Sequence, residues 1–513
     1  MWNRRPKRLR RWKRRTNTNL IQETPANLPV QESRPFLVHG QWKPGAVTTP
    51  VVDPFTGKSV AQVAQATESD VEEAVASTSG SAAVMAQLPG HARYNMLQQI
   101  AALLYRRRDE CAQTITAEAG KPITDAKREV SRAIQTFTVA AEESRRIAGE
   151  VVPLDWTPGF DTHLGVLRRF PIGPILGITP FNFPLNLVAH KVAPALASGN
   201  PILIKPAPQT PLTALLLGEI ALEAGVPPGG LNVVPCDNTL AERMVVDPRF
   251  KLLSFTGSVS VGWMLKAKCG KKKITLELGG NAGVVIEPDA DLDLAAQRCA
   301  AGGFGYAGQT CISVQRVFVH QAVVDAFTTK LLMHVARLKL GDPAEETTTI
   351  GPLIDQAAAQ RVESWIGEAV ADGARLLLGG KRIGSLVEAT VLGNVRPEMK
   401  VSCREVFGPV VTVTPYRQLS EAVALLNQSD FGLQAGIFTQ DINKIFYAFR
   451  HCEVGAVLAN EIPTFRADHM PYGGVKDSGL GREGVRAAIE DMTEPRMLIM
   501  NLKEPSTSSE KSS

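Results

Sequence analysis

The sequence predicts an α/β protein built from two doubly wound lobes. The chain has 513 residues, 44% of them hydrophobic, and from about residue 173 onward short apolar segments alternate with helical ones. A chain of this length exceeds what one hydrophobic core usually supports. Continuous apolar strands separated by helices need crossover connections, which build a parallel sheet covered on both faces. We therefore expect ligands beyond the carboxyl ends of the strands and in a cleft between the lobes.

The residues before 173 are predicted to be mainly helical. The stretch 69–72 reads Ser-Asp-Val-Glu and has the form of a capping box, in which serine and glutamate satisfy free helix N–H groups. Two further runs, 97–104 and 130–141, carry apolar residues at amphipathic spacing. Gly120 and Gly149 are expected to end these two helices. Such stripes are most simply surfaces that face the core.

Two series of strands follow. The first comprises 173–179, 201–205, 231–235 and 251–255, and the second comprises 282–287, 316–320, 409–416, 435–439 and 455–459. The clearest helix of the first series starts at Thr210-Pro211, a predicted N-cap followed by proline at the first helical position, and stops before Gly225. The two series predict the two lobes.

Basic charge is concentrated at the N-terminus. Residues 4–15 hold nine Lys or Arg and no acid; without them, 47 basic residues stand against 51 acidic ones. The rest of the chain shows no basic cluster of the kind that binds nucleic acid, so we expect no nucleic-acid partner. We interpret the basic stretch as a disordered extension, with a targeting or membrane-surface role as the alternative. The Ser-rich terminus from Pro505 is also predicted to be disordered.

Other compositional features exclude several classes of protein. No stretch reaches the roughly 18 apolar residues that a membrane span needs, so a soluble protein is expected. The seven cysteines form no CxxC pair, which fits a reducing compartment, the cytoplasm, and argues against structural zinc. The eight histidines show no HExxH pattern, so no metal is expected.

Three residues are candidates for catalysis, each with a plainer alternative. Cys311, in FGYAGQTCIS (304–313), is either a buried small hydrophobe or a nucleophile whose small neighbours give access to its sulfur. Glu277, in LELGG, is either a satisfied structural acid or a base whose pKa burial raises. Asn182, in TPFNFP, is either a turn residue or an amide donor to developing negative charge.

Two segments are candidates for cofactor binding. The stretch 254–262 leaves a strand, turns at Gly257 and enters a helix at Ser258, where free backbone N–H groups favour a phosphate. It departs from the GxGxxG fingerprint, and a turn of this kind needs glycine in any case. Lys205 ends the strand 201–205, where a lysine is usually just solvated.

Seven motifs taken together resemble the aldehyde dehydrogenase superfamily. In chain order they are TPFNFPLNL, ILIKPAPQTP, SFTGSVSVG, LELGG, GYAGQTCIS, EVFGP and PYGGVKDSGLGREG. The resemblance covers roughly residues 35–503. It implies a Rossmann-like cofactor domain (34–150 and 169–277), a catalytic domain (278–489) and a small β oligomerisation element (151–168 and 490–503), with tails at 1–33 and 504–513. It also implies a homodimer or homotetramer.

The resemblance implies a role for each catalytic candidate. Cys311, as a thiolate whose pKa its surroundings lower, attacks the aldehyde and later carries a thioester. The amide of Asn182 and the backbone N–H of Cys311 hold the oxyanion. Glu277 activates the water that hydrolyses the thioester, which favours a free carboxylate over transfer to coenzyme A. Lys191 and Glu483 match positions near the proton path.

For the cofactor, the resemblance implies NAD or NADP. It places Lys205 on the adenosine ribose, Gly257 and Ser258 at the pyrophosphate, Glu405 on the nicotinamide ribose and Phe407 beside the nicotinamide ring. Many NAD-preferring members have glutamate three residues after the lysine, where it accepts from both ribose hydroxyls. Here that residue is Pro208. Its lack of charge slightly favours NADP.

The substrate is expected to be a small polar or anionic aldehyde, of the lactaldehyde, succinate semialdehyde or glyceraldehyde-phosphate type. The segment 463–474 borders the substrate entrance in relatives and brings Arg466 and His469 close to the site. Arg466 is either a clamp for a carboxylate or phosphate, or a structural residue that caps a loop or pairs across a subunit contact. The alternatives for function are a coenzyme A-acylating semialdehyde dehydrogenase and a non-enzymatic protein on the same fold.

Overall fold

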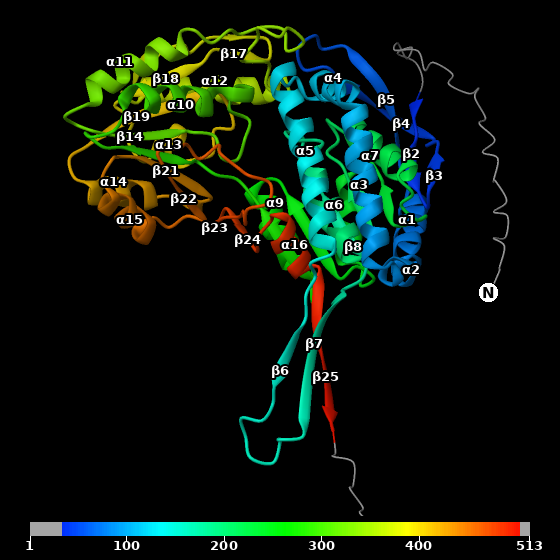
Figure 1. Ribbon diagram of the computed structural model, residues 1–513. Coiled ribbons are helices and arrows are strands. Elements are labelled where there is room, and N and C mark those ends of the chain that lie inside the picture. The colour runs from blue at the N-terminus through cyan, green and yellow to red at the C-terminus, as the bar shows by residue number, and fades with distance from the viewer. Residues whose placement is uncertain (1–32, 503–513) are drawn as a thin grey trace, which may run out of the picture.

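The computed structural model describes residues 33–502, which form two α/β lobes and a projecting three-stranded arm (Figure 1). The predicted fold class is confirmed. The predicted tails, 1–33 and 504–513, lie outside the described residues except for Ser33, which begins β1 (Ser33–Arg34). No helix among the described residues is both long enough and apolar enough to cross a membrane.

The first lobe is built on an eight-stranded sheet. In spatial order its strands are β24 (Gly479–Leu480), β12 (Lys273–Glu277), β11 (Leu252–Thr256), β8 (Ile175–Ile178), β9 (Ile202–Lys205), β10 (Leu231–Val233), β2 (Phe36–Val38) and β3 (Gln41–Lys43). The five central strands run parallel, and the order of β10, β9, β8, β11 and β12 is the 3-2-1-4-5 order of a Rossmann fold. The strand order therefore reverses between β8 and β11, where such sheets bind dinucleotides.

Helices cover both faces of this sheet. They are α1 (Glu68–Gly80), α2 (Ala82–Gln87), α3 (Gly90–Arg106), α4 (Arg108–Ala119), α5 (Ile123–Ser144), α6 (Asn186–Ser198), α7 (Leu212–Glu223), α8 (Asn238–Val246), α9 (Val259–Lys268) and α16 (Val485–Asp491). Every residue of α6 is buried, because this helix packs on β8 and β9 and is itself covered by α5 and α16. Side chains on α6 are thus held rigidly beneath the carboxyl ends of the strands.

The second lobe is built on a seven-stranded sheet. Its spatial order is β15 (Arg375–Leu378), β18 (Thr390–Gly393), β19 (Val410–Tyr416), β14 (Arg316–His320), β13 (Gly283–Ile286), β21 (Gln434–Phe438) and β22 (Ala456–Ala459). All pairs are parallel except β15 with β18. Val284 and Val285, neighbours on β13, belong to separate apolar clusters, so both faces of this sheet are buried.

The helices of the second lobe are α10 (Leu292–Phe304), α11 (Val324–Val335), α12 (Gln356–Ala371), α13 (Lys400–Cys403), α14 (Leu419–Asn427) and α15 (Ile442–His451), with a 3₁₀ turn η1 (Gly305–Gly308) after α10. The minor strands are β4 (Val47–Val52), β5 (Ser59–Gln65), β16 (Arg382–Ile383), β17 (Leu386–Val387), β20 (Phe431–Gly432) and β23 (Val475–Lys476). The segment after β22 leaves this lobe and adds β24 to the first sheet, so residues 460–483 link the two lobes (Figure 1).

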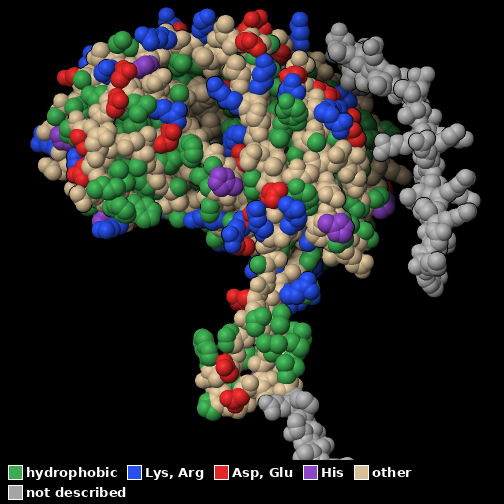
Figure 2. Space-filling view, in the orientation of Figure 1, with side chains coloured by type: hydrophobic (Ala, Val, Ile, Leu, Met, Phe, Trp, Pro, Cys, Tyr) green, Lys and Arg blue, Asp and Glu red, His purple; other side chains and the backbone are tan. Residues whose placement is uncertain are grey.

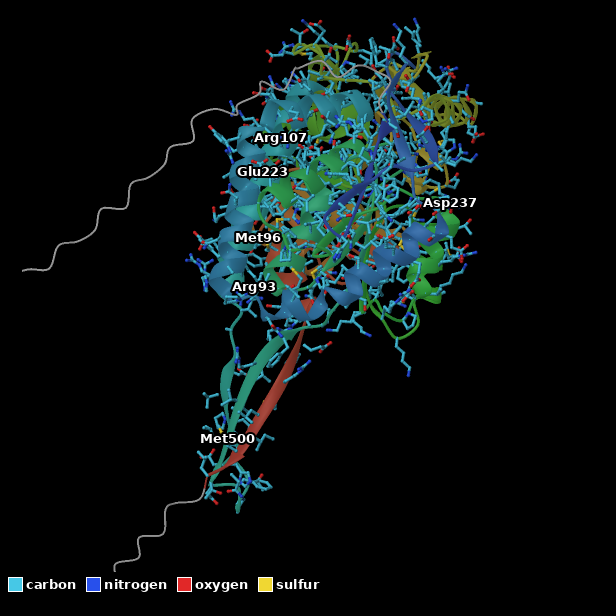
Figure 3. All side chains as sticks on the ribbon, turned by 90° about the vertical axis from the view of Figure 1, so that its right-hand side faces the viewer. Arg93, Met96, Arg107, Glu223, Asp237 and Met500 are labelled. Carbon is cyan, nitrogen blue, oxygen red and sulfur yellow. The ribbon has the colours of Figure 1, made fainter. Side chains whose placement is uncertain are left out.

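The arm is a sheet of β25 (Thr493–Asn501), β7 (His163–Pro171) and β6 (Glu150–Pro153), paired antiparallel. It projects away from the body, with Met500 far along it (Figure 3). Hydrophobic side chains gather on its surface (Figure 2). Among them Trp156 is 87% exposed and Val151 is 65% exposed. Such exposure is unusual for large apolar side chains and is typical of interaction surfaces.

The start of the first helix differs from the prediction. The capping box consists of Thr67 and Asp70 rather than Ser69 and Glu72: Asp70 accepts from the Thr67 N–H at 2.9 Å, and the Thr67 hydroxyl accepts from the Asp70 N–H at 3.3 Å. Glu72 instead pairs with Arg249 at 2.6 Å. The prediction was wrong by two residues because aspartate closes the box as well as glutamate does, and an arginine far along the chain holds Glu72.

Two predicted helix ends also differ. The helix that contains 97–104 is α3, whose C-cap is Arg107; Gly120, with φ of +63°, is the C-cap of α4. The third helix, α5, has its C-cap at Arg145 rather than at Gly149. Gly149 instead lies against β7, where the carbonyl of Leu167 leaves no room for a Cβ. That glycine is thus explained by the close approach of two backbones and not by a helix end.

The predicted cap of α7 at Thr210 is displaced by a distant carboxylate. The N-cap position is Pro211, and the first two helical N–H groups, of Leu212 and Thr213, donate to Glu118 of α4 at 2.7 and 3.0 Å. Burial raises the pKa of Glu118 to about 8. A capping group supplied by another helix leaves no local pattern, so the sequence placed this cap one residue too early.

Candidate active site

Cys311 opens into a cavity of about 270 Å³ between the two lobes. The residues around this cavity come from α5, from the start of α6, from the end of α10 and from the linking segment: Lys121, Asp125, Arg128, Glu129, Arg132, Phe183, Asn186, Leu187, Ala301, Gly302, Gly305, Tyr306, Thr310, Ile312, Thr464, Arg466 and Tyr472. The loop that leads to Cys311 passes through η1, where Tyr306 and Ala307 have φ of +49° and +52°. Backbone strain of this kind is commonly stored at functional sites.

The sulfur of Cys311 lies in an apolar setting. Its Sγ is 3.2 Å from the hydroxyl oxygen of Tyr472. Burial raises the pKa of the thiol to about 12, an effect that the contact with Tyr472 only partly offsets. The expectation that the surroundings lower this pKa is therefore wrong for the protein alone, because no cation forms a direct contact with the sulfur among the described residues.

Glu277, the last residue of β12, is the second catalytic candidate. Glu277 is only 3% exposed, yet both of its carboxylate oxygens lack a hydrogen-bond partner. Burial, reinforced by the charge of Glu483, raises the pKa of Glu277 well above its ordinary value. A Cβ at Gly473 would lie 2.8 Å from its Oε1, so the glycine keeps that side of the carboxylate open. An unpaired buried carboxylate with a raised pKa is suited to take a proton near neutral pH.

Asn182 follows β8 and is held from both sides. Its Nδ2 donates to the carbonyl of Gln309 at 2.9 Å, and its own carbonyl accepts from Lys121 Nζ at 2.6 Å. Its Oδ1 is buried without a partner. Lys121 is itself fully buried, paired with Glu129, with its ammonium over the ring of Phe183. The sequence analysis did not find Lys121, because a lysine after a helix-ending glycine carries no local signal.

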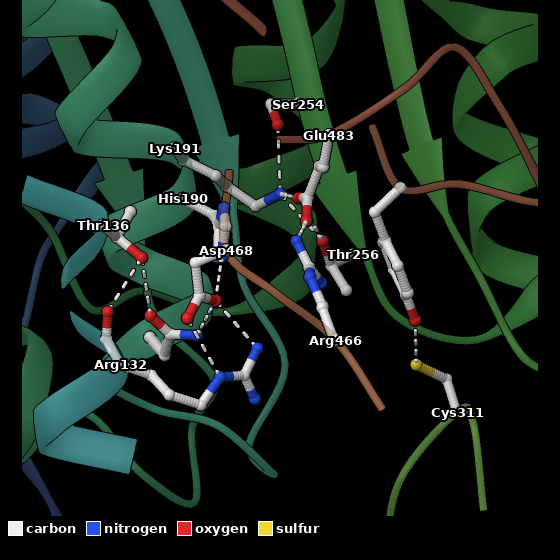
Figure 4. Close-up of polar contacts among 12 residues, drawn as sticks. Arg132, Thr136, His190, Lys191, Ser254, Thr256, Cys311, Arg466, Asp468 and Glu483 are labelled. Atoms are coloured by element: carbon white, nitrogen blue, oxygen red, sulfur yellow. Dashed lines mark hydrogen bonds and ion pairs between the residues drawn. The ribbon is translucent and has the colours of Figure 1, made fainter. Parts of the chain in front are cut away.

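Lys191 and Glu483 form a buried ion pair (Figure 4), and both charges act on the pKa of Glu277. Lys191, on α6, donates to Ser254 at 3.0 Å, to Thr256 at 2.7 Å and to Glu483 at 3.1 Å. Burial acts to raise the pKa of Glu483, but Lys191 and then Arg466 outweigh it and lower the pKa to about 2. Glu483 is therefore a fixed negative charge, and it raises the pKa of Glu277 further.

A second buried network, missed from the sequence, lies next to this pair. We call it the Asp468 cluster; its members are Arg132, Thr136, Asn186, His190 and Asp468 (Figure 4). The Asp468 carboxylate accepts hydrogen bonds from Arg132 at 2.8 Å, from His190 at 2.9 Å and from Asn186 at 3.1 Å. Burial lowers the pKa of His190 to about 4, so this imidazole is neutral near pH 7. The cluster ties α5 and α6 to the linking segment.

Arg466 reaches the cavity wall, but its guanidinium is already engaged. Its side chain is 5% exposed, pairs with Glu483 at 3.0 Å and stacks 3.7 Å from the ring centroid of Tyr472. The Nε of Arg466 is buried without a partner. His469, which the sequence placed near the site, is exposed and does not line the cavity. Arg466 thus already makes a structural ion pair, with Glu483 of the same chain. Its Nε is left free for a ligand.

Comparisons with known proteins now identify the architecture around Cys311. Residues 42–498 match the model of the aldehyde dehydrogenase family. The chain belongs to the aldehyde dehydrogenase family. A curated relative, the 3-sulfolactaldehyde dehydrogenase of Priestia aryabhattai, is 43% identical over 466 residues, which cover 91% of this chain and 97% of that protein.

Solved structures agree with this assignment. Aldehyde dehydrogenase 21 from Physcomitrella patens, in complex with the reaction product succinate, has a TM-score of 0.89 at 45% identity and covers 91% of this chain and 98% of its own. The NADP-dependent glyceraldehyde-3-phosphate dehydrogenase of Bacillus halodurans, complexed with NADP, has a TM-score of 0.90 at 34% identity. The match covers 92% of this chain and 100% of that one. The protein is an NAD(P)-dependent aldehyde dehydrogenase.

The residues of this aldehyde dehydrogenase fit a dinucleotide at the switch point of the first sheet. Ser258, directly after Gly257, is the N-cap of α9, and its hydroxyl makes no capping bond. The first N–H groups of α9 thus face outward with a free hydroxyl beside them, as a pyrophosphate requires. Lys205, at the end of β9, is 4% exposed and has one long contact, 3.5 Å to Asn238. It is buried rather than solvated, which leaves it available to a ribose hydroxyl.

The nicotinamide end of the predicted cofactor site lies at the second lobe. Glu405 accepts from the N–H of Gly280 at 2.9 Å, and burial raises its pKa to about 7. Phe407, with φ of +48°, lies edge-on to Phe181 at 5.8 Å between ring centroids. A Cβ at Gly280 would lie 2.5 Å from the carbonyl of Cys311, so this glycine lets the segment that binds Glu405 approach the backbone of Cys311.

Proposed function

We propose that this enzyme oxidises a small aldehyde with an anionic or strongly polar end and releases the free carboxylate. The observation that carries the proposal is the cavity at Cys311, which is small and has three arginines in its wall. Its volume of about 270 Å³ falls just below the roughly 300–1,000 Å³ typical of ligand pockets. The named substrate of the curated relative and the succinate bound to the structural neighbour are likewise short anionic molecules.

The reaction starts at Cys311. Its thiolate attacks the carbonyl carbon, and the resulting oxyanion is held by Asn182 Nδ2 and the backbone N–H of Cys311. NAD(P)⁺, when bound, supplies the hydride acceptor that turns the thiohemiacetal into a thioester. Glu277 then takes a proton from water, and the hydroxide that forms attacks the thioester. Lys191 and Glu483 lie beside Glu277, where their charges act on its pKa in opposite directions.

Glu277 favours hydrolysis over transfer of the acyl group to coenzyme A. Its two free oxygens are the acceptors that a hydrolytic water needs. The test is turnover in the absence of coenzyme A, with one carboxylate formed for each NAD(P)H. A requirement for coenzyme A would favour the acylating alternative, and an inert protein would favour the non-enzymatic one.

We assign the recognition of the anionic end to Arg466. Arg132 is held by Asp468 through two nitrogens, and Arg128 is paired with Asp125 at 2.7 Å on the exposed rim. Arg466 alone of the three has an unpartnered buried nitrogen in the cavity wall. A charge-assisted hydrogen bond from that nitrogen to a carboxylate, sulfonate or phosphate discriminates against neutral aldehydes of equal length.

The test of this assignment compares succinate semialdehyde with butyraldehyde. In Arg466→Met we expect kcat/KM to fall about 10- to 150-fold more for the anionic aldehyde, which corresponds to the roughly 1.5–3 kcal/mol of a charged hydrogen bond. Arg146→Met, which removes an exposed arginine outside the cavity, is the matched control and should change neither value. An equal loss on both aldehydes would contradict the clamp and leave Arg466 a structural role.

We further propose that NADP is preferred over NAD. Pro208 places no carboxylate three residues after Lys205, so nothing at that position accepts from the ribose hydroxyls or repels a 2′-phosphate. Pro208→Glu should shift the ratio of kcat/KM values toward NAD by about tenfold or more, since it restores both effects. A wild-type kcat/KM with NADP about a hundredfold below that with NAD would reject the proposal.

The arm supports a proposal of self-assembly into a homodimer or homotetramer. Leu498 and Ile499 of β25 are more than half exposed, and β25 and β6 are both edge strands. Leu498→Asp should lower the mass in solution, whereas Met333→Asp, at an equally exposed site on α11, should not. A monomeric wild-type mass would contradict the assignment of 151–168 and 490–503 as the oligomerisation element.

We also propose a cytoplasmic location and the domain division predicted from the sequence, with 34–150 and 169–277 binding the cofactor and 278–489 supplying the nucleophile. All seven cysteines are free thiols, which supports a reducing compartment. Cell fractionation tests the location. Limited proteolysis with and without NADP tests the division, because the cofactor should protect the first unit selectively.

A further inference from the structure

We propose that Tyr472 is a further catalytic residue, whose hydroxyl donates a hydrogen bond to the thiolate of Cys311 and so stabilises the reactive form of the nucleophile. The inference rests on the proposed function only in taking Cys311 as the nucleophile. Its basis is the 3.2 Å contact between the Tyr472 hydroxyl and Cys311 Sγ. Among the described residues each of these atoms has no other hydrogen-bond partner than the other.

The position of the hydroxyl is fixed from several directions. The backbone of Tyr472 exchanges two hydrogen bonds with that of Glu483, at 2.9 and 2.6 Å. Its ring packs with Ile312 and Leu433 in a small apolar cluster. The guanidinium of Arg466 lies 3.7 Å from the ring centroid, and a cation over a phenol draws electron density from it and makes the hydroxyl a stronger donor.

The direction of donation follows from charge. A thiol and a phenol exchange only a weak hydrogen bond in either direction, whereas a thiolate accepts a charge-assisted one from the phenol. The contact therefore favours the thiolate over the thiol. Thiolate formation breaks the S–H bond and passes its proton to the solvent of the cavity, while the O–H bond of Tyr472 stays intact. Burial raises the pKa of Tyr472 well above its ordinary value, so the phenol keeps its proton.

This role compensates for the apolar setting of Cys311. Burial disfavours the thiolate most, the charges of Glu405 and Glu277 disfavour it further, and the charge of Arg466 offsets part of this. A phenol stabilises negative charge without adding a positive charge that would repel the cofactor's pyridinium. Because the hydroxyl is a neutral donor, the bond is given up without large cost when the sulfur moves to the carbonyl carbon.

The test is the pH dependence of alkylation of Cys311 by iodoacetamide in the full chain without cofactor, followed by mass spectrometry of the peptide that contains Cys311. In Tyr472→Phe we expect the midpoint to rise by about one unit, a tenfold loss of thiolate below the midpoint. The loss in kcat/KM should be about tenfold near neutral pH and should shrink as the pH approaches the midpoint. Tyr416→Phe is the matched control, because its buried hydroxyl donates to the carbonyl of Ile286 at 3.0 Å and lies outside the cavity; its midpoint should equal that of the wild type.

A second variant moves the midpoint in the other direction. Tyr472→3-fluorotyrosine makes the phenol a stronger donor with little change in shape, so the alkylation midpoint should fall below that of the wild type. Midpoints unchanged in both variants would overturn the role of Tyr472 and leave the proposed function intact. By contrast, aldehyde oxidation by wild-type enzyme whose Cys311 is fully alkylated would overturn the proposed function itself.

Discussion

The reacting groups, which are Cys311, Glu277 and Asn182, lie next to the Asp468 cluster. The carboxylates of the two sets differ in how many hydrogen bonds they accept. Asp468 accepts from three different side chains, and its pKa is lowered accordingly. Glu277, buried to a similar degree, has no partner on either oxygen, and its pKa is raised. Burying a polar group without a partner costs about 1–3 kcal/mol, more for a charged group. At Glu277 a substrate or a water can complete the bonds, whereas in the Asp468 cluster the carboxylate is fully bonded and only the Nδ1 of His190 lacks a partner among its buried side-chain atoms.

The comparison separates two kinds of residue that burial alone does not distinguish. A buried carboxylate whose oxygens all accept hydrogen bonds contributes to stability, because it joins elements that are distant in the chain. A buried carboxylate without partners serves chemistry, because its bonding capacity is reserved for the reaction. Substitutions in the reacting groups should therefore change rate more than stability, and substitutions in the Asp468 cluster should do the reverse.

The largest effect is expected for Cys311→Ala. Removal of the nucleophile leaves no route to the thioester, so kcat for NAD(P)H formation should fall by at least about 10⁴-fold. The thermal midpoint should change little, since the sulfur makes one hydrogen bond and the side chain is small. Absorbance of NAD(P)H and a thermal melt measure the two quantities. Retention of a tenth of the wild-type rate would show that another group performs the attack.

Glu277→Gln should lower steady-state kcat by about 10²- to 10⁴-fold, the range of general-base catalysis. The acyl transfer to Cys311 precedes this step, so a burst of one NAD(P)H per subunit should remain before the slow phase. In the wild type, kcat should rise with pH through the raised pKa of Glu277, because only the ionised carboxylate takes a proton from water. The glutamine variant should lose this rise, and a variant with normal steady-state turnover would exclude Glu277 as the base.

The comparison also shows how far the sequence alone reaches. Strands such as β8 and β9 were predicted because continuous apolar runs between proline and glycine are local signals. The cap of α7 was misplaced because Glu118, distant in the chain, supplies the capping group. The cap of α1 was misplaced because two local pairs, Thr67 with Asp70 and Ser69 with Glu72, fit a capping box, and the distant Arg249 binds Glu72. The local sequence pattern thus predicts that an element forms more reliably than it predicts the residue at which the element begins.

The same limit applies to the site. Cys311, Glu277 and Asn182 stand in short motifs, so the sequence could single them out. The contact of Cys311 with Tyr472 spans 161 residues, and that of Arg132 with Asp468 spans 336, so no local pattern indicates either. The lowered pKa expected for Cys311 was wrong for the same reason, since burial depends on which distant segments cover the thiol.

Asn182 and Asn186 lie four residues apart and allow the same contrast to be tested with two asparagines. Asn182→Ala should lower kcat/KM by about 10²- to 10³-fold, the cost of one oxyanion donor. Its stability should stay near that of the wild type, because loss of the bond to Gln309 is offset by removal of the unpartnered Oδ1. Asn186→Ala loses bonds to Thr136 and Asp468, so it should destabilise the fold with a smaller effect on rate. Equal losses of rate in both variants would contradict the division.

The smallest effect on rate is expected for Asp468→Asn, which keeps the shape of the side chain and removes its charge. We expect kcat/KM to stay within about tenfold of the wild type, while the free energy of unfolding falls by about 3–5 kcal/mol, because the partly buried Arg132 loses the negative charge of its buried partner. Chemical denaturation followed by fluorescence measures the loss. Asp293→Asn, which removes an exposed carboxylate paired with Lys330, is the control and should leave stability unchanged.

The pH dependence of that loss provides a further check on Asp468. Burial acts to raise its pKa, but the bonds from His190 and Arg132 outweigh burial and depress it in the folded state. The stability that Asp468 confers is therefore fully present above its ordinary pKa and is lost as the pH falls through the depressed value. The difference between wild type and Asp468→Asn should be constant near neutral pH and should narrow only in strong acid. A difference that grows with acidity would mean that Asp468 is held as a neutral acid, and that the Asp468 cluster resembles Glu277 after all.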